Sequence, residues 1–161
     1  MDKALVGKIF KFGLLGLLVA AGAFFIVNAI LYACVDIEGA TETVKAARNA
    51  PMIQNIALAV ACLGVAVYLV LGIFGLDKIG TFVLIGAGVV AIALLIVSLI
   101  VANPMLDALK SAIEALEALN LDAAGTKAQY YGMIFTGIGE AIVFGGLPVV
   151  YGVKKLLVKG E

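Results

Sequence analysis

Residues 81–103, TFVLIGAGVVAIALLIVSLIVAN, decide the fold of this chain. The stretch is 23 residues long and carries no charged side chain, and only Ser98 interrupts the apolar run between its polar ends. At 1.5 Å per residue, a helix of this length crosses a hydrocarbon core about 30 Å thick. The stretch therefore predicts a transmembrane helix.

Three further runs of the same character surround it, at residues 12–35, 52–75 and 130–153. The second run is separated from residues 81–103 by five residues only, so these two runs are expected to be antiparallel neighbours. Pro51 stands just before the second run, where proline fits the first helical turn. We predict an all-α membrane protein, a four-transmembrane-helix bundle formed by residues 1–161 as a single integral membrane domain.

The composition supports membrane embedding. Apolar residues make up 64% of the chain and charged residues 14%, against about 45–50% and 25% in soluble domains. A soluble domain of this size could not bury so much apolar surface. Membrane lipid is therefore the expected partner. The net charge is zero and no basic patch occurs, so nucleic acid is not expected as a partner.

Two polar connections, residues 36–50 and 104–129, separate the spans. Residues 41–49 of the first favour two helical turns. In the second, Asn103 is a helix-capping residue and Pro104 suits the first helical position. The following sequence, PMLDALKSAIEALEALN, has apolar and charged residues at helical spacing on separate faces. It predicts an additional amphipathic helix, at an angle to the third span, that lies on the membrane surface or on a partner.

The distribution of basic residues predicts the orientation. The two termini and the middle turn share one side of the membrane, which holds seven lysines: Lys3, Lys8, Lys11, Lys78, Lys154, Lys155 and Lys159. The other side holds four basic residues: Lys45, Arg48, Lys110 and Lys127. The side richer in basic residues is expected to be cytoplasmic. We predict a multi-pass membrane protein with both termini in the cytoplasm and residues 36–50 and 104–129 outside.

Histidine, which enzymes use most often as a general base, is missing. The commonest metal ligand is thereby also absent. Cys34 and Cys62 fall at different depths in their spans and are not expected to pair. No catalytic set, metal site or cofactor site is predicted, and we do not expect an enzyme.

Glu140 is the one acid inside a spanning run and is expected near the membrane midplane. A carboxyl group at that depth is costly, which makes it a candidate functional site. The structural alternative is a protonated Glu140 that is hydrogen-bonded to an amide such as Asn28 or Gln54. Asn28, Gln54, Asn55 and Thr136 are all expected in the outer half of the membrane. Together with Glu140 they form the candidate intramembrane polar site.

Small residues at helical spacing predict close helix packing on two spans. They are Gly137, Ala141 and Gly145 on the fourth span, and Gly13 and Gly16 on the first. Gly145 and Gly146, followed by Pro148, are expected to kink the fourth span, because proline has no N–H to donate.

Two functions are compatible with this sequence. The first is a structural or accessory subunit that assembles with itself, as a homo-oligomer, or with other membrane subunits. The alternative is a transporter or channel component that uses Glu140 as a proton, cation or polar-solute site. The inner half of the spans is nearly all aliphatic, so we expect no continuous polar path through one protomer.

Overall fold

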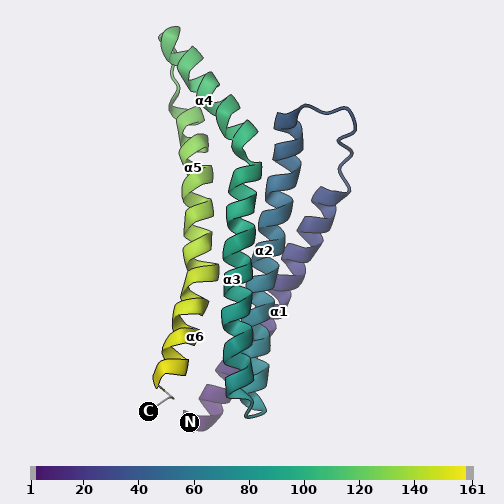
Figure 1. Ribbon diagram of the computed structural model, residues 1–161, viewed down its shortest axis with the longest axis vertical. Coiled ribbons are helices and arrows are strands. Elements are labelled where there is room, and N and C mark those ends of the chain that lie inside the picture. Colours follow the sequence, from purple (N-terminus) through teal and green to yellow (C-terminus); the bar gives the residue numbers. More distant parts are fainter. Residues whose placement is uncertain (1–2, 159–161) are drawn as a thin grey trace.

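A computed structural model describes residues 3–158, with the side chains of residue 7 and of residues 9–158. The described chain folds into helices joined by short connections (Figure 1). In chain order these are α1 (Lys3–Ala33), α2 (Glu42–Ile73), α3 (Asp77–Val101), α4 (Asn103–Ala118), α5 (Ala124–Glu140), the π-helical segment η1 (Ala141–Gly146) and α6 (Leu147–Val158). The last three follow one another without a break and form one long rod.

Four helices in the described part of the chain are long and apolar enough to cross a membrane. They are Ile9–Ala33, Glu42–Ile73, Asp77–Val101 and Ala124–Val158, and each contains most or all of a predicted span. The prediction of an all-helical chain with four such helices is confirmed, and α4 is the expected additional helix. Residues 34–41 and the α4–α5 connection lie at one end of the molecule, here called the loop end (Figure 1). The α2–α3 connection lies at the opposite end, the turn end.

The predicted start of the second helix at Pro51 is wrong. Helix α2 begins at Glu42, and Pro51 lies inside it. The Thr41 hydroxyl caps the helix by accepting a hydrogen bond from the Val44 N–H at 3.4 Å, and Glu42 places a negative charge at the positive end of the helix. The free energy gained from the cap and the two turns that follow it is therefore larger than the cost of the one backbone hydrogen bond that Pro51 cannot donate.

Arg48 connects the start of α2 to the end of α1. Its guanidinium donates to the carbonyl oxygen of Tyr32 at 2.9 Å and to that of Ala33 at 2.5 Å. The last carbonyl groups of a helix have no partner within the helix, and a cation there also interacts favourably with the helix dipole. Arg48 thus satisfies the end of α1 and holds the two helices together at the loop end.

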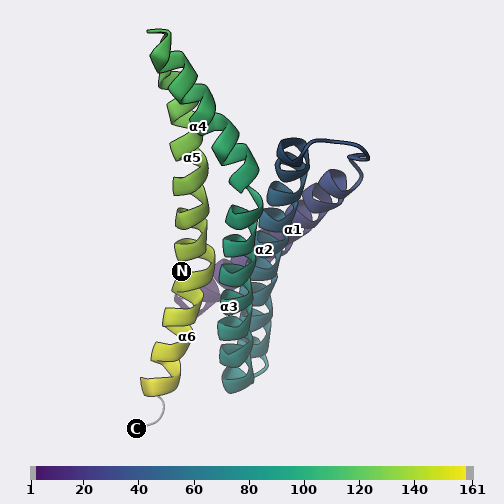
Figure 2. The same ribbon diagram turned by 45° about the horizontal axis from the view of Figure 1, so that its top comes forward.

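The helices do not contribute equally to the packing. Helices α2 and α3 pack along their length, and α3 also packs against η1 and α6, whereas α1 packs chiefly against α2. Figures 1 and 2 show α1 inclined to α2 and α3. Large apolar side chains of α1 are consequently exposed, with Phe10 71%, Leu17 67% and Phe24 63% accessible. This surface suits contact with lipid tails or with another membrane helix.

Glycines determine how closely α3 approaches its neighbours. A Cβ atom on Gly88 of α3 would lie 2.8 Å from the Gly145 carbonyl oxygen and 2.8 Å from Val149 Cγ2. On the opposite helix, a Cβ on Gly145 would clash with Ile92, and one on Gly137 would lie 2.7 Å from Leu99 Cδ2. The expected packing residues Gly137 and Gly145 therefore lie where two helices come into contact, and a larger residue there would require neighbouring side chains to shift.

The other predicted packing residues have different surroundings. Ala141 is half-buried beside a shallow apolar groove. A Cβ on Gly13 or Gly16 would have no other part of the described chain within 4 Å. The reason is that α1 diverges from the remaining helices. Packing through Gly13 and Gly16 stays a prediction that requires a second chain.

At the place of the expected kink, the fourth span contains the π-helical segment Ala141–Gly146. The Leu147 N–H bonds to the Ile142 carbonyl, five residues back, and Pro148 falls in the first turn of α6. Because Pro148 has no N–H, the backbone must change its hydrogen-bonding pattern at this place. The wider turn absorbs that change, and the rod continues to Val158 (Figure 1).

Helix α4 is separate from α3, as predicted, and begins at Asn103 with Pro104 in its first turn. The predicted cap is wrong, because Ala102 occupies the capping position and no side chain caps the helix. Helix α4 leans against the start of α5, and the two form a hairpin that projects past residues 34–41 (Figure 1). An ion pair of 2.5 Å between Lys127 and Glu117 joins its two arms.

Candidate functional site

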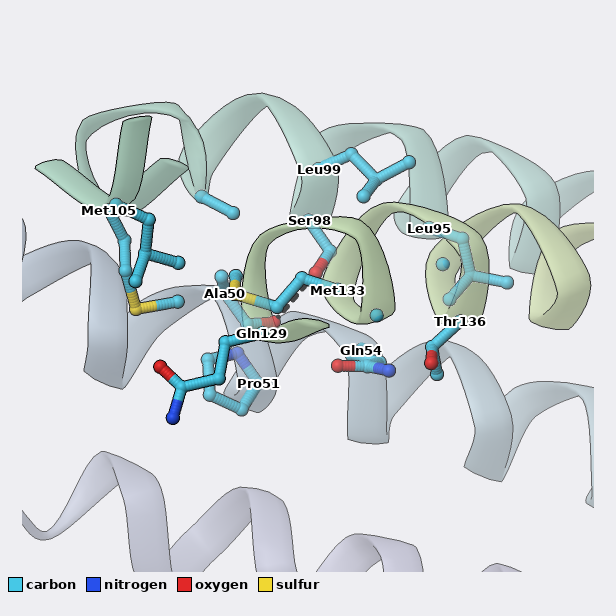
Figure 3. Close-up of a pocket in the computed structure, with 14 residues that line it drawn as sticks. Ala50, Pro51, Gln54, Leu95, Ser98, Leu99, Met105, Gln129, Met133 and Thr136 are labelled. Atoms are coloured by element: carbon cyan, nitrogen blue, oxygen red, sulfur yellow. Dashed lines mark hydrogen bonds between the residues drawn. The ribbon is translucent and has the colours of Figure 1, made fainter. Parts of the chain in front are cut away.

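A cleft of about 570 Å³ lies at the loop end between α2, α3, α4 and α5 (Figure 3). Its volume falls within the range of about 300–1,000 Å³ that is usual for small-molecule sites. Helices α2 and α5 form its sides, α3 lies between them, and α4 closes it toward the loop end. The angle between α3 and α4 arises at the start of α4, where Pro104 lies in the first turn, and it gives the cleft its shape (Figure 1).

Apolar side chains make up most of the cleft wall. Leu95 and Leu99 come from α3, Met105 and Leu109 from α4, and Met133 from α5. Methionine is unbranched and flexible, so it adapts its shape to different apolar groups. The wall can therefore accommodate a hydrocarbon body.

Polar side chains line the same cleft at separate levels. Figure 3 shows Gln54 and Thr136 at one end of the cleft and Gln129 toward the other. On α5, Gln129, Gly132 and Thr136 recur at spacings of three and four residues, which brings them to one face of the helix. Amide and hydroxyl groups both donate and accept hydrogen bonds, so they can orient a ligand that has a polar head.

Glu140 lies one helical turn beyond Thr136, toward the turn end, and is half-buried. Its carboxyl oxygen Oε2 accepts a hydrogen bond of 2.5 Å from Nε2 of Gln54. The bond joins the end of α5 to α2 next to the cleft. Of the two amides considered as partners from the sequence, Gln54 and not Asn28 makes this contact.

The five residues of the candidate polar site do not all come together. Gln54, Thr136 and Glu140 lie at or beside the cleft, but Asn28 is on α1 and donates to the Phe24 carbonyl at 3.2 Å. Asn55 donates to the Pro51 carbonyl at 2.7 Å. Both amides thus bond to their own helix four residues back. Asn28 is separated from the cleft because α1 packs on α2 and not on α5.

Two polar residues that line the cleft, Ser98 and Gln129, were not part of the predicted polar site. Ser98 is buried, and its hydroxyl donates to the Ala50 carbonyl at 2.8 Å, which joins α3 to α2 behind the cleft. Gln129 precedes the fourth apolar run and was not selected from the sequence. Its position seven residues before Thr136, on the same helical face, is the signal that could have identified it.

A second polar cluster at the turn end was also not predicted. Lys155 Nζ of α6 contacts Asp77 Oδ1 at 2.8 Å and the Tyr68 hydroxyl at 2.9 Å. The ammonium also lies 4.8 Å from the centre of the Tyr68 ring, and Tyr151 packs edge-on against that ring. The cluster connects α2, α3 and α6, so it holds the long rod against the other helices at the end opposite the cleft.

The polar groups at the cleft can bind a ligand through hydrogen bonds. Among the described residues, no three His, Cys, Asp or Glu side chains converge to hold a metal ion, and both cysteines are free. The polar side chains at the cleft are the amides of Gln54 and Gln129 and the hydroxyls of Ser98 and Thr136, and the Glu140 carboxyl group lies beside it. Comparison with known proteins gives no protein-family model, no curated protein and no solved structure that matches this chain.

Proposed function

We propose that this chain is a non-enzymatic integral membrane protein, with both termini in the cytoplasm, that works as a structural or accessory subunit. It assembles with itself or with other membrane subunits. The observation that carries the proposal is the hydrogen bond between Gln54 and Glu140. The only acid inside a spanning run is engaged by a neighbouring helix, which is the arrangement expected of a group that stabilises helix association.

The other polar contacts of the spans support the same role. Ser98 bonds to α2 behind the cleft, and Lys155 joins three helices at the turn end. Between these two levels, α3 packs against η1 and α6 through glycines and aliphatic side chains. Conduction requires polar groups or water along its route, and the side chains of this packing offer few polar groups.

Helix α1 supplies the surface for assembly. It packs chiefly on α2, and Gly13 and Gly16 form a flat stripe on it that no other part of the described chain covers. Such stripes allow the backbones of two membrane helices to approach closely. A second copy of α1 or a helix of another subunit is the proposed occupant.

Native mass spectrometry of the full chain, released from its membrane in mild detergent, tests this function. We expect species heavier than the 16.6 kDa protomer. Gly16→Leu should reduce the assembled fraction several-fold, because the new side chain holds the partner helix away. Gly139→Leu is the matched control, since position 139 also faces open space. A wild-type protein that is entirely monomeric would contradict the proposal.

The cleft beside Glu140 favours a transporter or channel component as the second candidate. Glu140→Gln separates the two, because glutamine retains the size of the side chain and cannot ionise. A subunit stabilised by the Gln54–Glu140 bond should keep its assembly and its cellular function in this variant. If Glu140 is a proton or cation site, the variant should assemble normally while ion or solute flux in proteoliposomes is abolished.

A further inference from the structure

The depth of the cleft in the protein indicates what kind of ligand it takes. Gln129 stands just before the fourth apolar run, Pro51 just before the second, and Ala102 near the end of the third. The cleft therefore extends from the boundary between polar and apolar sequence into the first turns of the spans. A ligand at this level meets polar side chains, among them Gln54 and Thr136, as well as an apolar wall. An amphiphile fits both.

The charges of the cleft narrow the choice of head group. None of the described residues that line it is Lys, Arg, Asp or Glu. A phosphate head placed there would lose water without gaining an opposite charge, which is costly. The one carboxyl group beside the cleft, that of Glu140, already accepts a hydrogen bond from Gln54. The neutral groups of Gln129, Gln54 and Thr136 match a hydroxyl or carbonyl head instead. Gln54 gives one N–H to Glu140 and retains a second N–H and its carbonyl oxygen.

From these observations we propose that the cleft between α2, α3, α4 and α5 is a binding site for an uncharged lipid-like amphiphile. The apolar body lies against Leu95, Leu99 and Met133, and the hydroxyl or carbonyl head bonds to the Gln54 and Thr136 side chains. The site is independent of the assembly surface on α1. Loss of binding would leave the proposed subunit role intact, and loss of assembly would leave this site intact.

Photo-crosslinking tests the site with a defined probe. The probe is a monooleoylglycerol with a diazirine in its acyl chain, incorporated with the full-length protein into phosphatidylcholine nanodiscs. Peptide mass spectrometry then locates the label. We expect saturable labelling at Met105, Leu109 or Met133, which line the cleft. Labelling spread over the lipid-exposed surface of α1, without saturation, would overturn the proposal.

A matched pair of glycine substitutions tests whether the cleft itself holds the probe. Gly132 lines the cleft and a Cβ there would have nothing within 4 Å, so Gly132→Leu adds bulk to the cleft wall without a clash at its first side-chain atom. Gly139→Leu adds the same bulk to the same helix outside the cleft lining. We expect labelling to fall at least ten-fold in the first variant and to stay unchanged in the second. Equal labelling in both variants would reject the site.

The head group is tested separately. Thr136→Val keeps the shape of the side chain and removes its hydroxyl, and it should weaken probe binding about three- to ten-fold, the effect of one lost neutral hydrogen bond. Excess unlabelled monooleoylglycerol should compete with the probe, whereas lysophosphatidylglycerol of the same chain length should compete at least ten-fold less well. Equal competition by the two lipids would overturn the assignment of an uncharged head. Thr136→Val also tests the proposal if Gly132→Leu fails to fold.

Discussion

Single polar residues in this protein act mainly by joining helices. The Gln54–Glu140 bond is the clearest case, because its two partners come from helices that are otherwise in little contact on the loop-end side. Asn55 is one residue from Gln54, yet it bonds only to its own helix. Comparing Gln54 with Asn55 therefore separates the stability contributed by a hydrogen bond between helices from that contributed by an amide bonded within its own helix.

We predict that Gln54→Leu destabilises the folded protein more than Asn55→Leu does. Removing the donor leaves the Glu140 carboxyl group half-buried without its partner, at a cost of about 1–3 kcal/mol. Adding Glu140→Leu to Gln54→Leu should recover most of this loss, because an apolar pair leaves no polar group unpaired. Unfolding measured in bicelles by steric trapping would report the difference. Equal losses for Gln54→Leu and Asn55→Leu would show that the bond contributes nothing.

Lys154 and Lys155 offer a second matched pair. Lys155 bonds to Asp77 and Tyr68, whereas the adjacent Lys154 is exposed. Lys155→Met should lower the free energy of unfolding by about 1 kcal/mol, and Lys154→Met should change it little, because partly exposed ion pairs contribute modestly. High salt should reduce the effect of Lys155→Met, since salt screens accessible charges. Thermal unfolding in detergent, monitored by circular dichroism, is a suitable measurement. Identical unfolding curves for the two variants would show that the Lys155 contacts do not stabilise the fold.

At the scale of helices, close approach depends on where glycines meet. Helix α3 carries Gly86 and Gly88 two residues apart, and therefore on different faces. Gly88 faces the Gly145 carbonyl, while a Cβ on Gly86 would meet nothing within 4 Å. The contact between α3 and the long rod depends on Gly88. The position of Glu140 and of the cleft depends on this contact.

We predict opposite effects for Gly88→Ala and Gly86→Ala. The Cβ on residue 88 would lie 2.8 Å from both the Gly145 carbonyl oxygen and Val149 Cγ2, so the two helices must separate and stability falls. Gly86→Ala removes backbone freedom without a clash and should stabilise α3 by up to about 1 kcal/mol. The ratio of folded to unfolded protein in a denaturant titration measures both. A stabilised Gly88→Ala protein would show that the contact is loose.

At the scale of the whole molecule, the polar ends define the orientation. We predict that the loop end faces outward, because its connections hold fewer basic residues than the sequences at the turn end. Single cysteines at Glu38 and Glu114, in a background lacking Cys34 and Cys62, should react with a membrane-impermeant thiol reagent on intact cells. A cysteine at the exposed Leu76 should react only after the cells are opened. Labelling of the Leu76 position alone on intact cells would invert the orientation.

The sequence by itself determined the number and approximate limits of the helices that can span a membrane. Hydrophobic length is a local property of a run, so residues 81–103 identify a span without reference to any neighbour. The same holds for the separate α4, since Pro104 acts within one helical turn, although Ala102 takes the capping position expected of Asn103. The start of α2 was predicted wrongly because two competing signals, the Thr41 cap and Pro51, lie ten residues apart. Whether the helix begins at Glu42 or at Pro51 depends on the free energy of the turns between them.

Only the tertiary structure decided which residues meet. The spans are apolar on nearly every side, so periodicity does not show which face of a helix turns toward which neighbour. Asn28 and Gln54 were equivalent partners for Glu140 in the sequence, and the packing of α1 on α2 alone excluded Asn28. Gly16 and Gly145 both occur in small-residue stripes, yet only Gly145 meets another helix. Helix crossing angles and registers come from side-chain packing along whole helices, which no local pattern specifies.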